Sequence, residues 1–70
     1  MQRWEYSTLE WIWAAGELRI TLPGRDEVLR RGSYVEVVAT LCELGRERWE
    51  VVGEVAAGDW VYWTLKRPLE

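Results

Sequence analysis

The sequence predicts an α+β fold in the order ββαββ, with a four-stranded antiparallel sheet and one helix packed on one face. Three observations predict it. Similar turn signals lie at residues 14–16 and 56–58, each between segments that alternate apolar and polar residues. Between these hairpins, Ser33 and Glu36 have the spacing of a helix start. Residues 1–70 have the length of one domain.

The first hairpin is expected to turn at residues 14–16, where Gly16 can adopt the left-handed conformation of a three-residue loop. This turn places Trp13 opposite Glu17, and strand alternation then divides the side chains between two faces. The face expected to meet the helix carries Trp4, Tyr6, Thr8, Ile12, Leu18, Ile20 and Leu22, with Glu10 as a polar exception. The outer face carries Leu9, Trp11, Trp13, Glu17, Arg19 and Thr21.

The helix is expected to begin after Ser33, with Glu36 reaching back to complete a capping box, and to stop at Gly45. Residues 24–32 before it are expected to form a loop with a short helical turn at 26–29. The helical period places the apolar side chains on the side that should pack on the sheet: Tyr34, Val38, Leu41 and Cys42. The solvent side should carry Glu36, Thr40 and Glu43.

The second hairpin is expected to turn at residues 56–58, with Val55 opposite Asp59. Its core face would carry Trp49, Val51, Gly53, Val55, Val61, Trp63 and Leu65, and its outer face Glu50, Val52, Glu54, Trp60, Tyr62 and Thr64. A strand order of 2-1-3-4 makes every neighbouring pair antiparallel and permits a right-handed crossover between the hairpins.

Several short stretches are shared with one known family: Trp4-Glu5-Tyr6, Leu41-Cys42-Glu43-Leu44-Gly45, Trp49-Glu50-Val51-Val52 and Lys66-Arg67-Pro68. They resemble the pattern WEY…LNxLGxxGWELV…KRP of a small bacterial family known as domain of unknown function 4177. Arg48 stands where that pattern has a glycine, and residues 14–32 are longer than its usual link from strand to helix. The resemblance implies a helix on a small antiparallel sheet, and it implies no activity.

The composition argues against several classes of function. The formal net charge is −3 and Lys66 is the only lysine, whereas nucleic-acid binding requires clustered basic residues. No segment is long and apolar enough for a membrane span, and the first residues lack the layout of a signal peptide. With one cysteine no internal disulfide can form, so we expect a cytoplasmic protein.

The sequence offers few groups for catalysis, and we expect a protein that is not an enzyme. Histidine is absent, which removes the commonest general base and the commonest zinc ligand sets. Cys42 lies on the side of the helix expected to face the core, where a buried thiol is inert. We expect no metal and no cofactor.

The predicted outer face is the candidate functional surface, because its aromatic side chains lie where the helix cannot cover them. It comprises Leu9, Trp11, Trp13, Glu50, Val52, Glu54, Trp60 and Tyr62. The favoured use is self-association, since aromatic residues dominate interface cores and a domain this small needs added stabilisation. The alternative is a site for a small cationic or aromatic ligand, because tryptophan faces beside carboxylates attract cations. Stacking of single-stranded nucleic acid and an unknown protein partner are further, weaker options.

Overall fold

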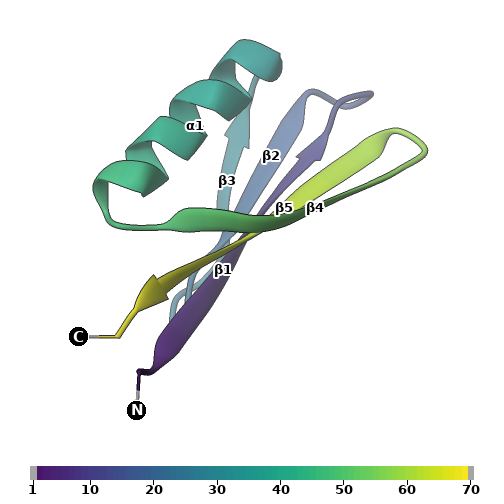
Figure 1. The fold of residues 1–70 in the computed structure, drawn as a ribbon. Helices are drawn as coiled ribbons and strands as arrows, with labels where there is room; N and C mark the ends of the chain where they lie inside the picture. Colours follow the sequence, from purple (N-terminus) through teal and green to yellow (C-terminus); the bar gives the residue numbers. More distant parts are fainter. Residues whose placement is uncertain (1, 70) are drawn as a thin grey trace.

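The computed structural model describes residues 2–69, which form one helix and one antiparallel sheet (Figure 1). The elements are β1 (Trp4–Ile12), β2 (Glu17–Thr21), β3 (Val28–Arg31), α1 (Tyr34–Arg46), β4 (Glu50–Ala57) and β5 (Trp60–Pro68). The predicted α+β class is confirmed. The sheet has five strands and not four, because the segment expected to form a loop with a helical turn pairs with β2 as β3.

The strand order is β3-β2-β1-β5-β4. The predicted order 2-1-3-4, which numbered only four strands, placed the first strand of the second hairpin beside β1 and is wrong. The last strand, β5, lies beside β1, and the two pair over their full lengths from Trp4↔Pro68 to Ile12↔Trp60. The shorter β4 is left at the sheet edge. Its glycine and two glutamates, Gly53, Glu50 and Glu54, are residues that suit an edge strand better than a central one.

The register of the first hairpin differs from the prediction by one residue. Ile12 pairs with Glu17, so the turn takes four residues, 13–16, and Gly16 adopts a φ of 65°. A shift of one residue exchanges the two faces of a strand. On β1 the side chains toward α1 are therefore Ser7, Leu9 and Trp11, while those predicted to be inward, Trp4, Tyr6, Thr8 and Ile12, point away. The prediction for β2 is confirmed, since Leu18 and Ile20 are buried.

A bulge in β4 exchanges its faces halfway along the strand. The register with β5 shifts between Val51 and Gly53. Before the bulge, Val51 lies opposite the buried Leu65, as predicted for the core face. After it, Glu54 lies opposite the buried Trp63, and Val55 turns outward opposite Tyr62. The predicted sides of Glu54 and Val55 are thus reversed. The hairpin turns at residues 58–59, with Ala57 paired to Trp60, so the predicted turn at 56–58 and the pairing of Val55 with Asp59 are wrong.

Helix α1 begins as predicted and ends later than predicted. Ser33 is the N-cap, and its backbone N–H donates to the Glu36 carboxylate at 2.9 Å. The helix runs past Gly45 to Arg46. The chain then turns at Arg48, which has a φ of 73°, while the amide of the following Trp49 donates to the Leu44 carbonyl at 3.1 Å. These features form a Schellman motif in which an arginine takes the left-handed position usually held by glycine.

The core lies between α1 and one side of the sheet. Its buried apolar members are Leu9, Leu18, Ile20, Val37, Leu44, Trp49, Trp63 and Leu65. The helix lies toward the β3 side, where Arg30 donates to the Glu43 carboxylate at 3.1 Å. The β4–β5 hairpin extends away from α1 (Figure 1), and every residue of β4 is exposed. One helix thus covers only part of the sheet.

Candidate functional site

The residues predicted to form one aromatic face are divided between the two sides of the sheet. Leu9 is fully buried in the core. Trp11 lies on the α1 side, where its ring centroid is 5.7 Å from that of Tyr34 and its indole N–H donates to the Gly32 carbonyl at 3.4 Å. Trp13 lies in the hairpin turn and is exposed. The one-residue register shift in β1 explains all three positions.

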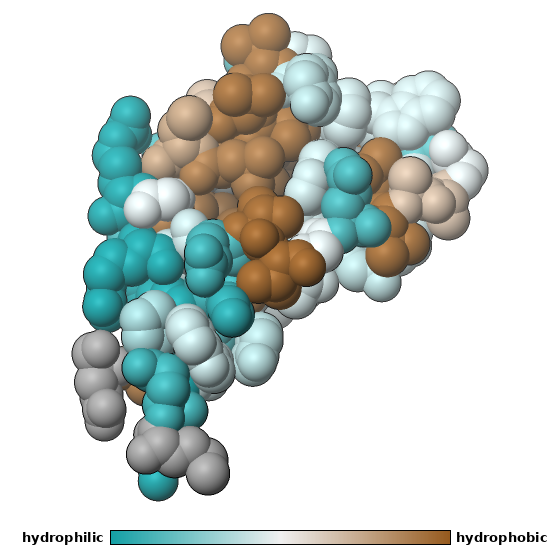
Figure 2. All heavy atoms as spheres, in the orientation of Figure 1, coloured by the Kyte–Doolittle hydropathy of each residue, from teal (hydrophilic) through white to brown (hydrophobic). Residues whose placement is uncertain are grey.

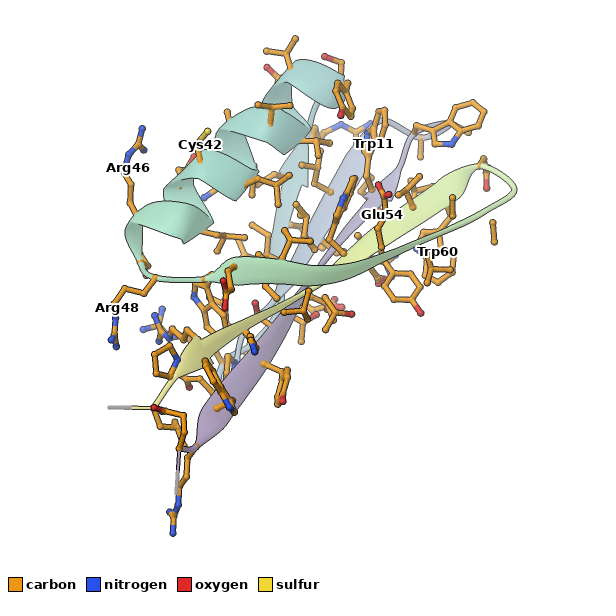
Figure 3. The ribbon with its side chains drawn as sticks, viewed as in Figure 1. Trp11, Cys42, Arg46, Arg48, Glu54 and Trp60 are labelled. Atoms are coloured by element: carbon orange, nitrogen blue, oxygen red, sulfur yellow. The ribbon has the colours of Figure 1, made fainter. Side chains whose placement is uncertain are left out.

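The predicted residues of β4 and β5 are also separated. Glu50 lies on the outer face opposite Lys66, Val52 lies at the bulge, and Glu54 lies on the α1 side. Trp60 and Tyr62 are on the outer face as predicted, with ring centroids 4.7 Å apart. Figure 3 shows Trp11 and Glu54 on the α1 side of β4 and Trp60 on the other side. The single outer surface expected to contain Trp11, Trp13, Trp60 and Tyr62 is therefore not formed.

The orientation of α1 differs from the prediction in a way that bears on function. Its buried residues are Val37, Thr40 and Leu44, of which Thr40 was expected to face solvent. Most of the residues expected to face the sheet are exposed instead: Tyr34, Val38 and Cys42, with Leu41 half-buried. A second apolar side of the helix is consequently left uncovered by the sheet.

A first uncovered surface follows from this orientation, and we call it the helix-side surface. It comprises the exposed residues Tyr34, Val35, Val38 and Cys42 of α1 and Val51 of β4, with the half-buried Leu41 at its boundary with the core. Tyr34 is 60%, Val35 70% and Val38 45% exposed. Figure 2 shows apolar atoms in a continuous area that extends over α1 toward the beginning of β4. A contiguous apolar patch of this kind is typical of an interaction site.

A second uncovered surface is a shallow hollow on the outer face of the sheet. It has a volume of about 160 Å³ and is lined by Thr8 and Glu10 of β1 and by Trp60 and Tyr62 of β5. Glu10 and Tyr62 are direct cross-strand partners. The carboxylate of Glu10 forms no ion pair with another residue of the range 2–69. We call this feature the outer hollow.

A third depression, of about 120 Å³, lies where both ends of the described chain meet the turn after α1. It is lined by Glu5, Leu22, Pro23, Arg25, Glu47, Trp49 and Arg67. Arg67 makes two hydrogen bonds in this depression: Nε donates to the Glu5 carboxylate at 2.6 Å and Nη1 donates to the Glu47 carbonyl at 3.0 Å. The guanidinium also lies 4.3 Å from the centroid of the buried Trp49 ring. These contacts connect structural elements, so we assign the depression a structural role.

The electrostatics of the helix start are set by Ser33. Its backbone N–H is the main cause that holds the pKa of Glu36 below the usual glutamate range, and its hydroxyl, which donates to the same carboxylate oxygen at 3.0 Å, adds to the effect. Glu36 is exposed and lies at the positive end of the helix dipole, which favours the ionised form. This carboxylate therefore serves to cap the helix.

Sequence reasoning missed Thr8 and Glu10 as members of the outer hollow and Tyr34, Val35 and Val38 as an exposed surface. A signal for the second group was present. The apolar positions of residues 34–46 span far more of the helix circumference than one sheet contact can cover. The first group depended on the register of β1, which composition does not fix.

The chain matches no family model, no curated protein and no solved structure. The resemblance to domain of unknown function 4177 therefore stays a prediction. Among residues 2–69, no helix has the length and apolar character needed to cross a membrane. Within the same range, no three side chains of histidine, cysteine, aspartate or glutamate are grouped as metal ligands would be.

Proposed function

We propose that the protein is a non-enzymatic, cytoplasmic interaction module that associates with a second copy of itself through the helix-side surface. The observation that carries the proposal is the exposed apolar side of α1. A helix on the surface of a soluble domain normally turns charged residues to solvent, and an apolar arc on that side is typical of a helix that is buried further by a neighbour. Val35 and Val38 are the clearest members of this arc.

The shape of the chain supports a second copy as the neighbour. On the side of the sheet where α1 covers one half, the β4–β5 half has no helix over it. The exposed Val51 and the buried Trp63 both lie on this side of the β4–β5 half. In a pair related by a two-fold axis, each α1 would lie against the uncovered half-sheet of its partner. Such a contact uses the same patch on both copies, as a two-fold interface requires.

Size gives a further reason for association. A domain of about 70 residues rarely gains more than about 3 to 5 kcal/mol of net stability from its own core, and small scaffolds commonly add a disulfide, a metal or a partner. The single cysteine of this chain excludes an internal disulfide. Covering the helix-side surface would supply the missing burial.

The solution mass tests this proposal. The wild-type protein should exceed the monomer mass of 8.3 kDa in sedimentation velocity, and the excess should fall on dilution. Val38→Glu places a charge in the proposed interface and should give a monomer. Leu29→Glu is the matched control, because it replaces another exposed apolar residue, on β3 and away from the interface, and should leave the mass unchanged.

Cys42 gives an independent readout of the same contact. It is the only cysteine of the sequence and is exposed on α1, so any reaction with a thiol reagent measures the accessibility of this one position. Its reaction with a thiol reagent should slow as the protein concentration rises, and this dependence should disappear in Val38→Glu. A wild-type protein that is monomeric at every concentration, with constant Cys42 reactivity, would overturn the proposal.

A further inference from the structure

The outer hollow lies on the side of the sheet opposite the helix-side surface, so self-association through α1 leaves it open. Its walls come from two paired strands, β1 and β5, in the middle of the sheet. Central strands are held by hydrogen bonds on both edges, and the four lining residues therefore sit on a rigid base. Ligand binding in the outer hollow does not depend on self-association through α1.

Two aromatic rings form one wall of the hollow. Trp60 and Tyr62 are two positions apart on β5 and so point to the same face. Their ring centroids are 4.7 Å apart, with an angle of 38° between the planes, and both side chains are half-buried. The face of an aromatic ring is electron-rich and attracts a cation placed within about 6 Å of its centroid.

Elsewhere in the molecule, two tryptophan rings already form cation-π contacts with basic side chains of the same chain. The ammonium nitrogen of Lys66 lies 3.9 Å from the centroid of the Trp4 ring, and the guanidinium of Arg67 lies 4.3 Å from that of Trp49. Within residues 2–69, no cation of the chain lies over Trp60 or Tyr62. The rings of the hollow are therefore open to a cation from outside.

Glu10 supplies the negative charge beside these rings. It faces Tyr62 directly across the β1–β5 pair. On its other side it faces Arg19, but the guanidinium of Arg19 is 3.4 Å from the carboxylate of Glu17. Since Glu10 has no ion-pair partner within the described range, its charge is available to a ligand, and exclusion of water by that ligand would strengthen the attraction.

We propose that the outer hollow binds a methylated ammonium group, with Trp60 and Tyr62 against its methyl groups and Glu10 beside its charge. A quaternary ammonium suits this site because it combines a positive charge with an apolar surface, as recognition by aromatic cages requires. The volume of about 160 Å³ is below the range of about 300 to 1,000 Å³ that holds a whole drug-sized ligand, so the hollow suits a head group. The group could belong to a free quaternary amine or to a trimethylated lysine of a peptide.

Titration with choline tests the charge requirement. The probe should shift the indole N–H resonance of Trp60 in a saturable way, whereas 3,3-dimethylbutanol, its neutral isostere, should bind at least roughly threefold more weakly. A trimethyllysine peptide and its unmethylated counterpart distinguish the two sources. Tighter binding of the methylated peptide than of choline indicates a peptide ligand, and equal affinity indicates that the head group alone is recognised.

Two variants test whether Glu10 contributes to binding in the outer hollow. Glu10→Gln preserves the size of the side chain but removes its charge, and we expect it to weaken choline binding by roughly threefold or more. Glu50→Gln is the matched control, because Glu50 lies on the same face but outside the hollow, and it should leave the affinity unchanged. Equal affinity for choline and its neutral isostere, or equal weakening by both variants, would overturn the proposal. Binding retained in Val38→Glu shows that the result is independent of self-association.

Discussion

Arg48 has the least favourable backbone conformation for its side chain in the described range. It is the only residue other than glycine there with a positive φ, 73°, and it occupies the left-handed position after α1. A side chain with a Cβ is disfavoured in this conformation by about 1 to 2 kcal/mol. The Schellman motif keeps it there, because Trp49 must reach the core while its amide bonds to Leu44.

We predict that Arg48→Gly raises the free energy of unfolding by about 1 kcal/mol, since glycine adopts the left-handed conformation without steric cost. For a domain of this size the melting temperature should rise by about 4 to 8 °C per kcal/mol. Arg48→Ala is the control, because it removes the long side chain but keeps the Cβ. A glycine variant no more stable than the alanine variant would contradict the explanation.

The left-handed conformation at Arg48 could be predicted in part from the sequence. Arg48 stands where the resembling family has a glycine, and glycine at a helix end commonly marks this conformation. Gly45 gave the competing signal and led to a helix end that was too early. Gly45 has space for a side chain and no positive φ, so nothing in its surroundings requires glycine.

At the scale of the element, α1 depends on the charge of Glu36. Hydrogen bonds from Ser33 to its carboxylate, first from the backbone N–H and then from the hydroxyl, hold the pKa of Glu36 below its usual value. A carboxylate with a lowered folded-state pKa contributes stability that is complete above the unfolded pKa, about 4.3. That contribution is lost as the pH falls through the lower folded-state pKa.

We therefore predict that wild type exceeds Glu36→Gln in unfolding free energy near neutral pH and that the difference shrinks to its minimum in acid below the folded-state pKa. Urea unfolding from neutral to strongly acidic pH measures it. Ser33→Ala should retain part of this pH dependence, because the backbone N–H donor remains. A difference between wild type and Glu36→Gln that stays constant with pH would contradict the role of the charge.

The strands show where sequence reasoning was sufficient and where it was not. Turn chemistry located both hairpins along the chain but gave neither turn its correct length, and alternation assigned the buried faces of β2 and β5 correctly. The face of β1 was assigned wrongly because a loop of four residues replaced one of three. Leu9 and Trp11 on one face and Tyr6 and Ile12 on the other are all large apolar or aromatic residues, so the side-chain pattern alone could not decide between the two registers.

At the scale of the whole molecule, long-range pairing was the part that the sequence did not determine. The class and the helix could be predicted from local signals, whereas the order of strands depends on which edge of β1 the second hairpin joins. β3 was missed because its four residues are all exposed and lack alternation. The candidate surface was predicted wrongly for the same reasons. The position of Trp11 depends on the register of β1, that of Glu54 on the bulge in β4, and that of Val38 on the rotation of α1 about its axis.

Arg67 connects the parts of the fold that are most distant in sequence. Through Glu5, the Glu47 carbonyl and the Trp49 ring, it joins β1, the turn after α1 and the core to β5. The Arg67–Glu5 pair is mostly shielded, with 27% and 23% of the side chains exposed. Hydrogen bonds to charged groups in such positions contribute about 1.5 to 3 kcal/mol each.

We predict that Arg67→Lys lowers the free energy of unfolding by about 1 to 3 kcal/mol, because lysine keeps the charge but cannot make both directed hydrogen bonds and stack on Trp49. Lys66→Ala is the control: it removes a single contact with Trp4, worth about 0.5 to 1 kcal/mol when exposed. Urea unfolding at equal concentrations in the Val38→Glu background removes any contribution from association. If Arg67→Lys costs no more than Lys66→Ala, Arg67 makes only a surface charge contact, and the link between the two ends of the chain must come from strand pairing alone.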